Sequence, residues 1–145
     1  MTGMTLTTAL RERGMRATPQ RIVIHEALQG LNRHATAEQV RDAVADRLPG
    51  VSLPTVYATL DLLEALGLVR RLRAGSGAVL YDPRTTPHQH AVCRSCRAVE
   101  DLEADVDTAR VLTAALATGF QPDGADTVVT GLCAACRAAA AATPA

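Results

Sequence analysis

The four cysteines of the chain form two C-x-x-C pairs, Cys93 with Cys96 and Cys133 with Cys136. Two thiolates separated by two residues in a tight turn can bind one metal ion, and two such turns complete a tetrahedral site of four sulfurs. The alternatives are disulfides, which a reducing compartment disfavours, or a thioredoxin-type redox motif, which needs a strand–helix–strand unit that is not predicted here. The spacing therefore predicts a structural Zn²⁺ site with no open coordination position.

Two of the four histidines, His88 and His90, lie shortly before the first cysteine pair. Side chains two residues apart on an extended segment point to the same side, so these imidazoles could form half of a site for a first-row transition metal. A polar strand face explains the H-x-H pattern equally well. Because four thiolates saturate one zinc ion, the histidines are not needed there and require a role of their own.

Four helices are expected in the first half of the chain, and they would position such sites. They are predicted at about residues 5–13, 18–30, 36–48 and 52–66. Thr36 and Gln39 form a capping-box pattern, and Ser52 precedes Pro54 in the arrangement typical of a helix start. The third and fourth helices, joined by the short turn "PGVS", indicate a helix-turn-helix. His25 lies within the second helix and is expected at its surface or in a capping role.

The stretch "LVRRLRAGSGAVLYD" predicts a β-hairpin with a glycine-rich tip after these helices. Helices followed by such a hairpin indicate a winged helix, in which Arg70, Arg71 and Arg73 would contact DNA phosphates. A solvated wing is the alternative. Residues 1–85 carry 11 arginines against 8 acidic residues, a net charge of +3, whereas residues 86–145 carry 4 against 7, a net charge of −3. The first part is therefore the one expected to face an anion.

The second part of the chain predicts short strands at "HAVC", "AVEDL" and "DTVVTGL" and helices at "DVDTARVLTAALATG" and "CRAAAAA". The fold class is therefore α+β, with a winged-helix DNA-binding domain over residues 1–83, a hinge over 84–87 and a small α+β domain over 88–145. About 60 residues bury only a marginal core, so the cysteine site lies where a stabilising link is needed.

Other classes of protein are disfavoured by what the chain lacks. No apolar run approaches the roughly 20 residues of a membrane span, and the N-terminus lacks a secretory signal pattern, so a cytoplasmic protein is expected. A metal-dependent hydrolase would need an open metal position and a base, and no H-E-x-x-H motif is present. No catalytic residue and no small-molecule substrate is therefore predicted. A zinc-ribbon module that binds protein is a further alternative, against which the helix-turn-helix and wing argue.

Six motifs occur in order along nearly the whole chain, "RATPQR", "HATAEQV", "SLPTVYATLDLLEALGLV", "YD", "HQHAVCRSC" and "GLCAAC". In this combination the sequence resembles the ferric uptake regulator family of metal-dependent bacterial repressors. The resemblance implies a winged-helix domain, a hinge and an α+β dimerisation domain with zinc on the paired cysteines. It also implies a homodimer that binds a palindromic operator in double-stranded DNA.

The resemblance further implies a regulatory metal held at the hinge by ligands from both domains. Carried over by motif position, these ligands are His34, Asp82, His88, His90 and Asp101. Aspartate at both acidic positions resembles the peroxide-sensing branch, in which bound Fe²⁺ reacts with peroxide and a ligand histidine, here His34 or His88, is oxidised. Fe²⁺ or Mn²⁺ is the expected regulatory ion. The alternative is an uptake regulator that senses iron, Ni²⁺ or Zn²⁺ itself.

Within this likeness the fourth helix would enter the major groove, with Thr55, Tyr57 and Thr59 near its exposed N-terminal end. A half-buried packing role is the alternative for Tyr57. Arg16 resembles the basic residue that relatives place in the minor groove. Relatives often carry arginine after the tyrosine, so Ala58 departs from their pattern and supplies no guanine contact at that position.

Overall fold

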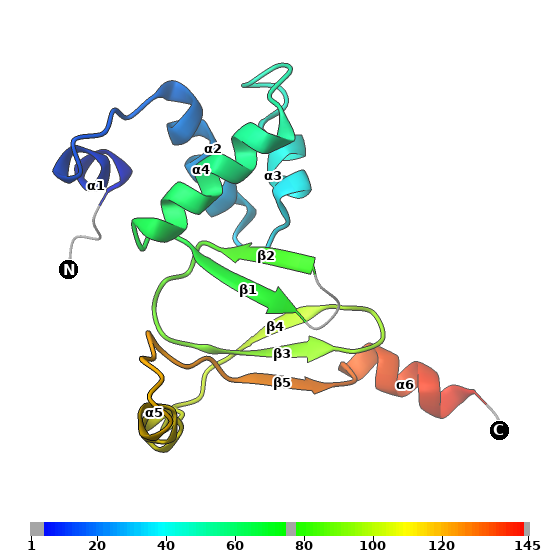
Figure 1. The fold of residues 1–145 in the computed structure, drawn as a ribbon. Helices are drawn as coiled ribbons and strands as arrows, with labels where there is room; N and C mark the ends of the chain where they lie inside the picture. The colour runs from blue at the N-terminus through cyan, green and yellow to red at the C-terminus, as the bar shows by residue number, and fades with distance from the viewer. Residues whose placement is uncertain (1–4, 75–77, 144–145) are drawn as a thin grey trace. The chain divides into compact units, whose positions relative to one another are not determined.

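The computed structural model describes residues 5–74 and 78–143, and the chain divides into two compact units, Met1–Thr85 and Thr86–Ala145 (Figure 1). The first unit contains α1 (Leu6–Glu12), α2 (Pro19–Leu31), α3 (Ala37–Val44), α4 (Leu53–Ala65), β1 (Arg70–Ala74) and β2 (Ala78–Asp82). The second contains β3 (Gln89–Cys93), β4 (Val99–Leu102), α5 (Ala109–Ala117), β5 (Val128–Gly131) and α6 (Ala134–Ala142). The predicted α+β fold class is confirmed, while residues 75–77 of the predicted hairpin tip lie outside the described part of the chain.

Helices of the first unit begin where local capping favours them. Thr36 Oγ1 accepts a hydrogen bond from the Gln39 N–H at 3.2 Å, and Gln39 Oε1 accepts one from the Thr36 N–H at 2.9 Å, which completes the predicted capping box. Ser52 Oγ likewise accepts the Thr55 N–H at 3.3 Å and starts α4. No helix among the described residues has the length and hydropathy needed to cross a bilayer.

Two helix ends differ from the sequence prediction. α2 passes Gly30 and ends at Leu31, because Asn32 takes the left-handed backbone conformation, with φ of 47°, that stops the helix. α3 ends at Val44 rather than at residue 48, because the backbone N–H groups that follow bond in tighter turns. Helix periodicity therefore located these helices well, whereas their last turns depended on local backbone geometry.

The first unit has a hydrophobic core formed by one face of each helix. Its fully buried apolar side chains include Leu10, Ile24, Leu28, Val40, Val44, Val56, Leu60 and Leu63. β1 and β2 pair antiparallel, with Arg71 opposite Tyr81 and Arg70 opposite Asp82. The Tyr81 side chain is only 1% exposed and belongs to the same core, so the hairpin is packed onto the helices rather than projecting from them.

The second unit is a three-stranded sheet with two helices that bury little. β3 lies in the centre, with β4 antiparallel on one side and β5 parallel on the other (Figure 1). Among the described residues of this unit, Val92 and Cys93 are the only buried apolar side chains, and neither α5 nor α6 buries a residue. Large apolar side chains are instead exposed, including Val111, Leu116, Phe120 and Val129.

Candidate metal centres and DNA-binding surface

The four cysteines converge on one point of the second unit. Their Sγ atoms all lie within 4.8 Å of one another, and Cys96 Sγ is 3.7 Å from Cys133 Sγ. Four thiolates about 2.3 Å from a tetrahedral zinc ion lie about 3.8 Å apart, so the cluster has the dimensions of a zinc site. All four side chains are free thiols, which excludes the alternative of disulfides for this structure. The cluster fits Zn²⁺ in a structural role, because sulfur fills every position of the tetrahedron.

Local structure at one end of the sheet, where Cys93 of β3 lies opposite Gly131 of the parallel strand β5, brings these thiols together. β3 ends at Cys93, and Arg97 closes the following turn in the left-handed conformation, with φ of 66° and its N–H donating to the Cys93 carbonyl at 3.0 Å. Cys133 occupies the N-cap of α6, where its Sγ accepts the Cys136 N–H at 3.5 Å. Backbone N–H groups of Cys133 and Cys96 lower the pKa of Cys93 from 9.0 to about 6. The lowered pKa favours the thiolate of Cys93, the form in which cysteine binds metal.

In the first unit, His34 and Asp82 form a pair that we call the N-terminal ligand pair. Ala35 and Tyr81 make a two-way backbone bridge, with N–H···O distances of 3.0 and 2.8 Å, and this bridge sets the neighbouring His34 and Asp82 opposite each other. His34 Nε2 lies 3.1 Å from Asp82 Oδ2, and the side chains are 10% and 4% exposed. Asp82 Oδ1 also accepts the backbone N–H of Arg84 at 2.9 Å, which fixes the carboxylate.

In the second unit, His88, His90 and Asp101 form a group that we call the C-terminal ligand trio. His90 on β3 lies directly opposite Asp101 on β4, and the ring centroids of the two histidines are 4.5 Å apart. Asp101 Oδ1 lies 3.5 Å from His88 Nε2 and 3.8 Å from His90 Nε2. His88 Nδ1 lies 2.7 Å from the Thr86 carbonyl, which can only accept, so Nδ1 carries the proton and Nε2 the lone pair. That tautomer is the one a metal ligand requires.

Both ligand groups have the chemistry of a divalent transition-metal site. Imidazole nitrogen and carboxylate oxygen suit Mn²⁺, Fe²⁺ and Zn²⁺, whereas the sulfur cluster suits Zn²⁺. The histidines of the trio are almost fully buried, with side chains 0% and 5% exposed. Burying a polar ring is unfavourable unless its nitrogens bind a partner, and a metal ion is such a partner. The structure therefore brings together the predicted ligands within each unit.

The predicted recognition helix α4 offers polar side chains near its N-terminal end. A cavity of about 280 Å³ between the starts of α2 and α4 is lined by residues that include Gln20, Arg21, Thr55 and Thr59. Thr59 is nevertheless only 6% exposed, so its expected position at an exposed end of the helix is wrong. The side of α4 that carries Thr59 faces α2. The apolar periodicity of α4 did not reveal this, because Thr59 is polar. Gln20 and Arg21 were missed by the sequence analysis, because nothing local shows that the two helix starts meet.

Tyr57 is 37% exposed and lies on the solvent side of α4. Its hydroxyl donates to Glu38 of α3 at 3.5 Å, a contact between helices that no spacing rule predicted. Arg16 is also exposed, and its carbonyl accepts a hydrogen bond from the Arg21 guanidinium at 2.8 Å. Both Tyr57 and Arg16 are accessible to a macromolecule in the described structure.

The three wing arginines have different surroundings. Arg71 forms ion pairs with Asp61 and with Glu64 of α4, the latter at 2.9 Å, so its charge already has partners within the protein. Arg70 is half-buried, and Arg73 is exposed. Of the three, Arg73 is therefore the most accessible to a DNA phosphate. The ion pairs of Arg71 would compete with a phosphate contact by that residue.

His25 was expected at the surface of α2 or in a capping role, and the expected exposure is wrong. The residue is only 8% exposed, and with Thr5, Leu6 and Thr7 at the start of α1 it lines a cavity of about 390 Å³. Burial lowers the pKa of His25 below its ordinary value of 6.5, against an opposing effect of Glu26. Helical periodicity placed His25 on a helix but could not show that it is buried.

The comparisons with known proteins agree with this geometry. The model of the ferric uptake regulator family matches residues 12–125 of the chain. The chain is 39% identical over 127 residues to ferric uptake regulation protein 1 of Mycolicibacterium fortuitum, covering 87% of this chain and 78% of that protein. It is 34% identical over 128 residues to the peroxide operon regulator of Bacillus subtilis, covering 88% of each.

A solved structure of a zinc uptake regulator complexed with zinc and DNA resembles the whole fold. Its TM-score is 0.68 at 26% sequence identity, covering 90% of this chain and 89% of that one. The likeness therefore extends over most of both chains.

Proposed function

Since the chain belongs to the ferric uptake regulator family of metal-dependent transcriptional regulators, we propose that it is a homodimeric repressor whose operator binding is controlled by one regulatory metal and ended by peroxide. The observation that carries the proposal is the presence, in each unit, of at least one imidazole that is 10% exposed or less and lies beside a carboxylate. Neither group has the sulfur ligands or the closed geometry of a structural zinc site.

The regulatory ion would be held by the N-terminal ligand pair together with the C-terminal ligand trio. Two donors or three donors alone leave a divalent ion incompletely coordinated, so the ion binds most tightly when both units contribute. Metal binding therefore favours the one arrangement of the units that completes the site. In a dimer, that arrangement would set the distance between the two α4 helices, which operator half-sites require to be constant.

The identity of the ion follows from its supply as well as from its ligands. Affinity for nitrogen and oxygen sites rises from Mn²⁺ through Fe²⁺ toward Ni²⁺ and Cu²⁺, and Zn²⁺ also binds more tightly than Fe²⁺. Fe²⁺ or Mn²⁺ is our choice because aspartate, a hard oxygen ligand, occupies both acidic positions. Regulation by Zn²⁺ or Ni²⁺ is the alternative that the metal titration below would reveal.

Peroxide sensing is supported by the pair of aspartates and by the relative named a peroxide operon regulator. A bound Fe²⁺ would activate peroxide beside the ligand shell. Peroxide would then oxidise the ring of His34 or His88 by two electrons: one peroxide oxygen replaces a ring C–H hydrogen and the other leaves as water. An oxidised ring is a poorer metal ligand. Weaker coordination removes the preference for the operator-binding arrangement, so the DNA is released.

DNA contacts would come from α4 and from basic residues of the first unit. Tyr57 and Thr55 lie near the start of α4 and would face base edges and phosphates, while Arg16 would reach the minor groove. Arg73 would contact phosphate on the wing, and Arg70 and Arg71 less directly. The positive charge of residues 1–85 supports this assignment of the DNA-binding side.

The cysteine cluster would hold Zn²⁺ solely to maintain the second unit. We place the protein in the cytoplasm, where thiols remain reduced and operators are accessible. We assign it no enzymatic activity, because the zinc is closed to substrate and the relatives it matches are named as regulators.

The test is operator binding by zinc-loaded protein, measured as fluorescence anisotropy on a palindromic segment upstream of its own gene. Mn²⁺, anaerobic Fe²⁺, Ni²⁺ and Zn²⁺ are titrated separately. His88→Ala should lower the metal-induced gain in affinity at least tenfold while the zinc content stays the same, because the cysteine cluster is intact. His25→Gln, which alters a histidine outside both ligand groups, serves as the control. Binding that is independent of every metal would overturn the proposal.

Peroxide is then added to the protein loaded with Fe²⁺ or with Mn²⁺. Peptide mass spectrometry should find one added oxygen on the peptide of His34 or His88 in the iron form alone, together with loss of operator binding. Unmodified peptides with a normal metal response would instead identify a plain metal sensor.

A further inference from the structure

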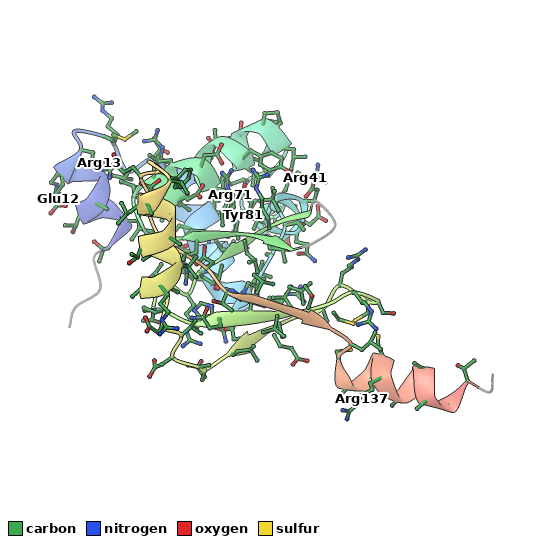
Figure 2. All side chains as sticks on the ribbon, turned by 60° about the horizontal axis from the view of Figure 1, so that its bottom comes forward. Glu12, Arg13, Arg41, Arg71, Tyr81 and Arg137 are labelled. Atoms are coloured by element: carbon green, nitrogen blue, oxygen red, sulfur yellow. The ribbon has the colours of Figure 1, made fainter. Side chains whose placement is uncertain are left out.

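The guanidinium of Arg71 joins the wing to the recognition helix. Its Nη2 pairs with both Asp61 and Glu64, which lie three residues apart and therefore on one face of α4. Its carbon atom lies 5.6 Å from the centroid of the Tyr81 ring, and Figure 2 shows the two side chains next to each other. Arg71 thus contacts α4 through its charge and β2 through the ring of Tyr81.

Stability alone does not account for this arrangement. The side chains of Arg71, Asp61 and Glu64 are 28%, 57% and 40% exposed, and ion pairs with such exposure contribute about 0–1 kcal/mol. The arrangement does fix geometry, because one cation holds two carboxylates of α4 against the strand opposite Tyr81. A second carboxylate adds little energy but restricts the angle between helix and strand.

The same strand carries a metal ligand. Tyr81 and Asp82 are consecutive residues of β2, so their side chains point to opposite faces. The backbone of Tyr81 is bonded in both directions to Ala35, the neighbour of His34. The Ala35–Tyr81 bridge therefore adjoins two features. The next residues along the chain, His34 and Asp82, form the N-terminal ligand pair, and the ring of Tyr81 itself contacts Arg71.

We propose that Arg71 is a positioning residue that couples the N-terminal ligand pair to the recognition helix. Binding of metal by His34 and Asp82 restricts the Ala35–Tyr81 bridge, and Arg71 transmits that restriction to the orientation of α4. Without the guanidinium the metal still binds, but α4 and the wing adopt a wider range of relative orientations, of which only a part matches the operator. The inference rests on the proposed function, since it needs operator binding that depends on metal.

Electrostatics alone would have a different signature. Loss of the Arg71 charge leaves two carboxylates on α4 and should weaken DNA binding with and without metal by the same factor. The coupling factor, which is the ratio of operator Kd without metal to operator Kd with metal, is insensitive to that common effect. By linkage, the operator must raise the metal affinity by this same factor.

The experiment compares Arg71→Gln with Arg73→Gln, using dimeric, zinc-loaded protein and Mn²⁺ as the probe. The control removes the same charge from the same strand at an exposed residue that forms no ion pair with another residue of the described ranges 5–74 and 78–143. Arg71→Gln should lower the coupling factor at least about fivefold, while the Mn²⁺ Kd without DNA stays within about twofold. Arg73→Gln should weaken operator binding equally with and without Mn²⁺, and Arg71→Lys should restore part of the coupling.

Glu64→Gln is a second variant that keeps Arg71 on Tyr81 but removes one carboxylate, and it should lower the coupling factor by less. It replaces Arg71→Gln as the deciding variant if circular dichroism shows that the latter misfolds. A coupling factor unchanged in the folded variant, or lowered equally by Arg73→Gln, would overturn the inference while the proposed function stands. A wild-type protein with no Mn²⁺ dependence would overturn both.

Discussion

Among the described residues, the first unit buries a cluster of 15 side chains. They come from all four of its helices and from neighbouring segments, and they include the ring of Tyr81. The described residues of the second unit bury only Val92 and Cys93 among apolar side chains, and its histidines His88 and His90 are buried beside them. A unit of about 60 residues with so small a core is marginal without a further link. The contrast indicates that the first unit folds by excluding water from apolar surface, whereas the second depends on metal ligands and on a partner.

This division suits a regulator. The unit that must read DNA has an apolar core that contains no metal ligand, so the recognition helix should remain folded with or without the regulatory metal. The second unit carries the cysteine cluster and the C-terminal ligand trio but little apolar core, so binding of an ion should alter its stability directly. Four perturbations would test the contrast.

The largest effect is expected from removal of the zinc site. Cys96→Ser deletes one of four thiolates, and structural zinc contributes about 10–16 kcal/mol to the folding of small domains. Zinc content should fall to near zero, and the second unit should unfold and become sensitive to proteolysis. The first unit should keep its helical circular dichroism and its resistance to protease. A variant that retains stoichiometric zinc and the wild-type melting curve would contradict the assigned site.

A cavity in the first unit should have a smaller and separate effect. Leu63 is fully buried on α4, and Leu63→Ala should lower the free energy of unfolding by about 2–5 kcal/mol. Urea unfolding followed by circular dichroism measures the loss, and the zinc content serves as the control because it should not change. Release of zinc from this variant would show that the two units depend on each other for folding.

The exposed apolar surface of the second unit should mediate self-association. Val129 is 52% exposed on β5, the strand at one edge of the sheet, and Val129→Asp should weaken the dimer at least about tenfold, or 1.4 kcal/mol. Thr130→Asp is the matched control, because the adjacent side chain lies on the opposite face of the same strand. Sedimentation equilibrium gives both dissociation constants. Equal weakening by the two variants would show that the face of the strand is unimportant.

The smallest effect concerns the pH dependence of the first unit. Burial lowers the pKa of His25 in the folded state below 6.5, so the unfolded state takes up the proton first. Stability should therefore decrease as the pH falls below 6.5 and continue to decrease until the pH passes the folded-state pKa. In His25→Gln this part of the decrease should disappear. Urea unfolding at several pH values gives the slopes, and identical slopes for both proteins would exclude His25 as the group responsible.

Several features of the molecule were predictable because they depend on residues close together in the chain. The two C-x-x-C turns, the capping box of Thr36 with Gln39 and the start of α4 at Ser52 all arise within four residues, where backbone geometry leaves few choices. The ligand groups themselves were indicated by family motifs rather than by spacing. His34 and Asp82 have no local relation that would reveal their contact.

What the sequence by itself determined is therefore the order of the elements, their capped starts and the thiols that can share one ion. The tertiary structure alone decided which faces of those elements meet. It buried His25 on α2 and Thr59 on α4, and it directed Arg71 to two carboxylates of α4. Periodicity places a side chain on an element, but burial and pairing depend on packing between segments distant in the chain, which no local pattern encodes.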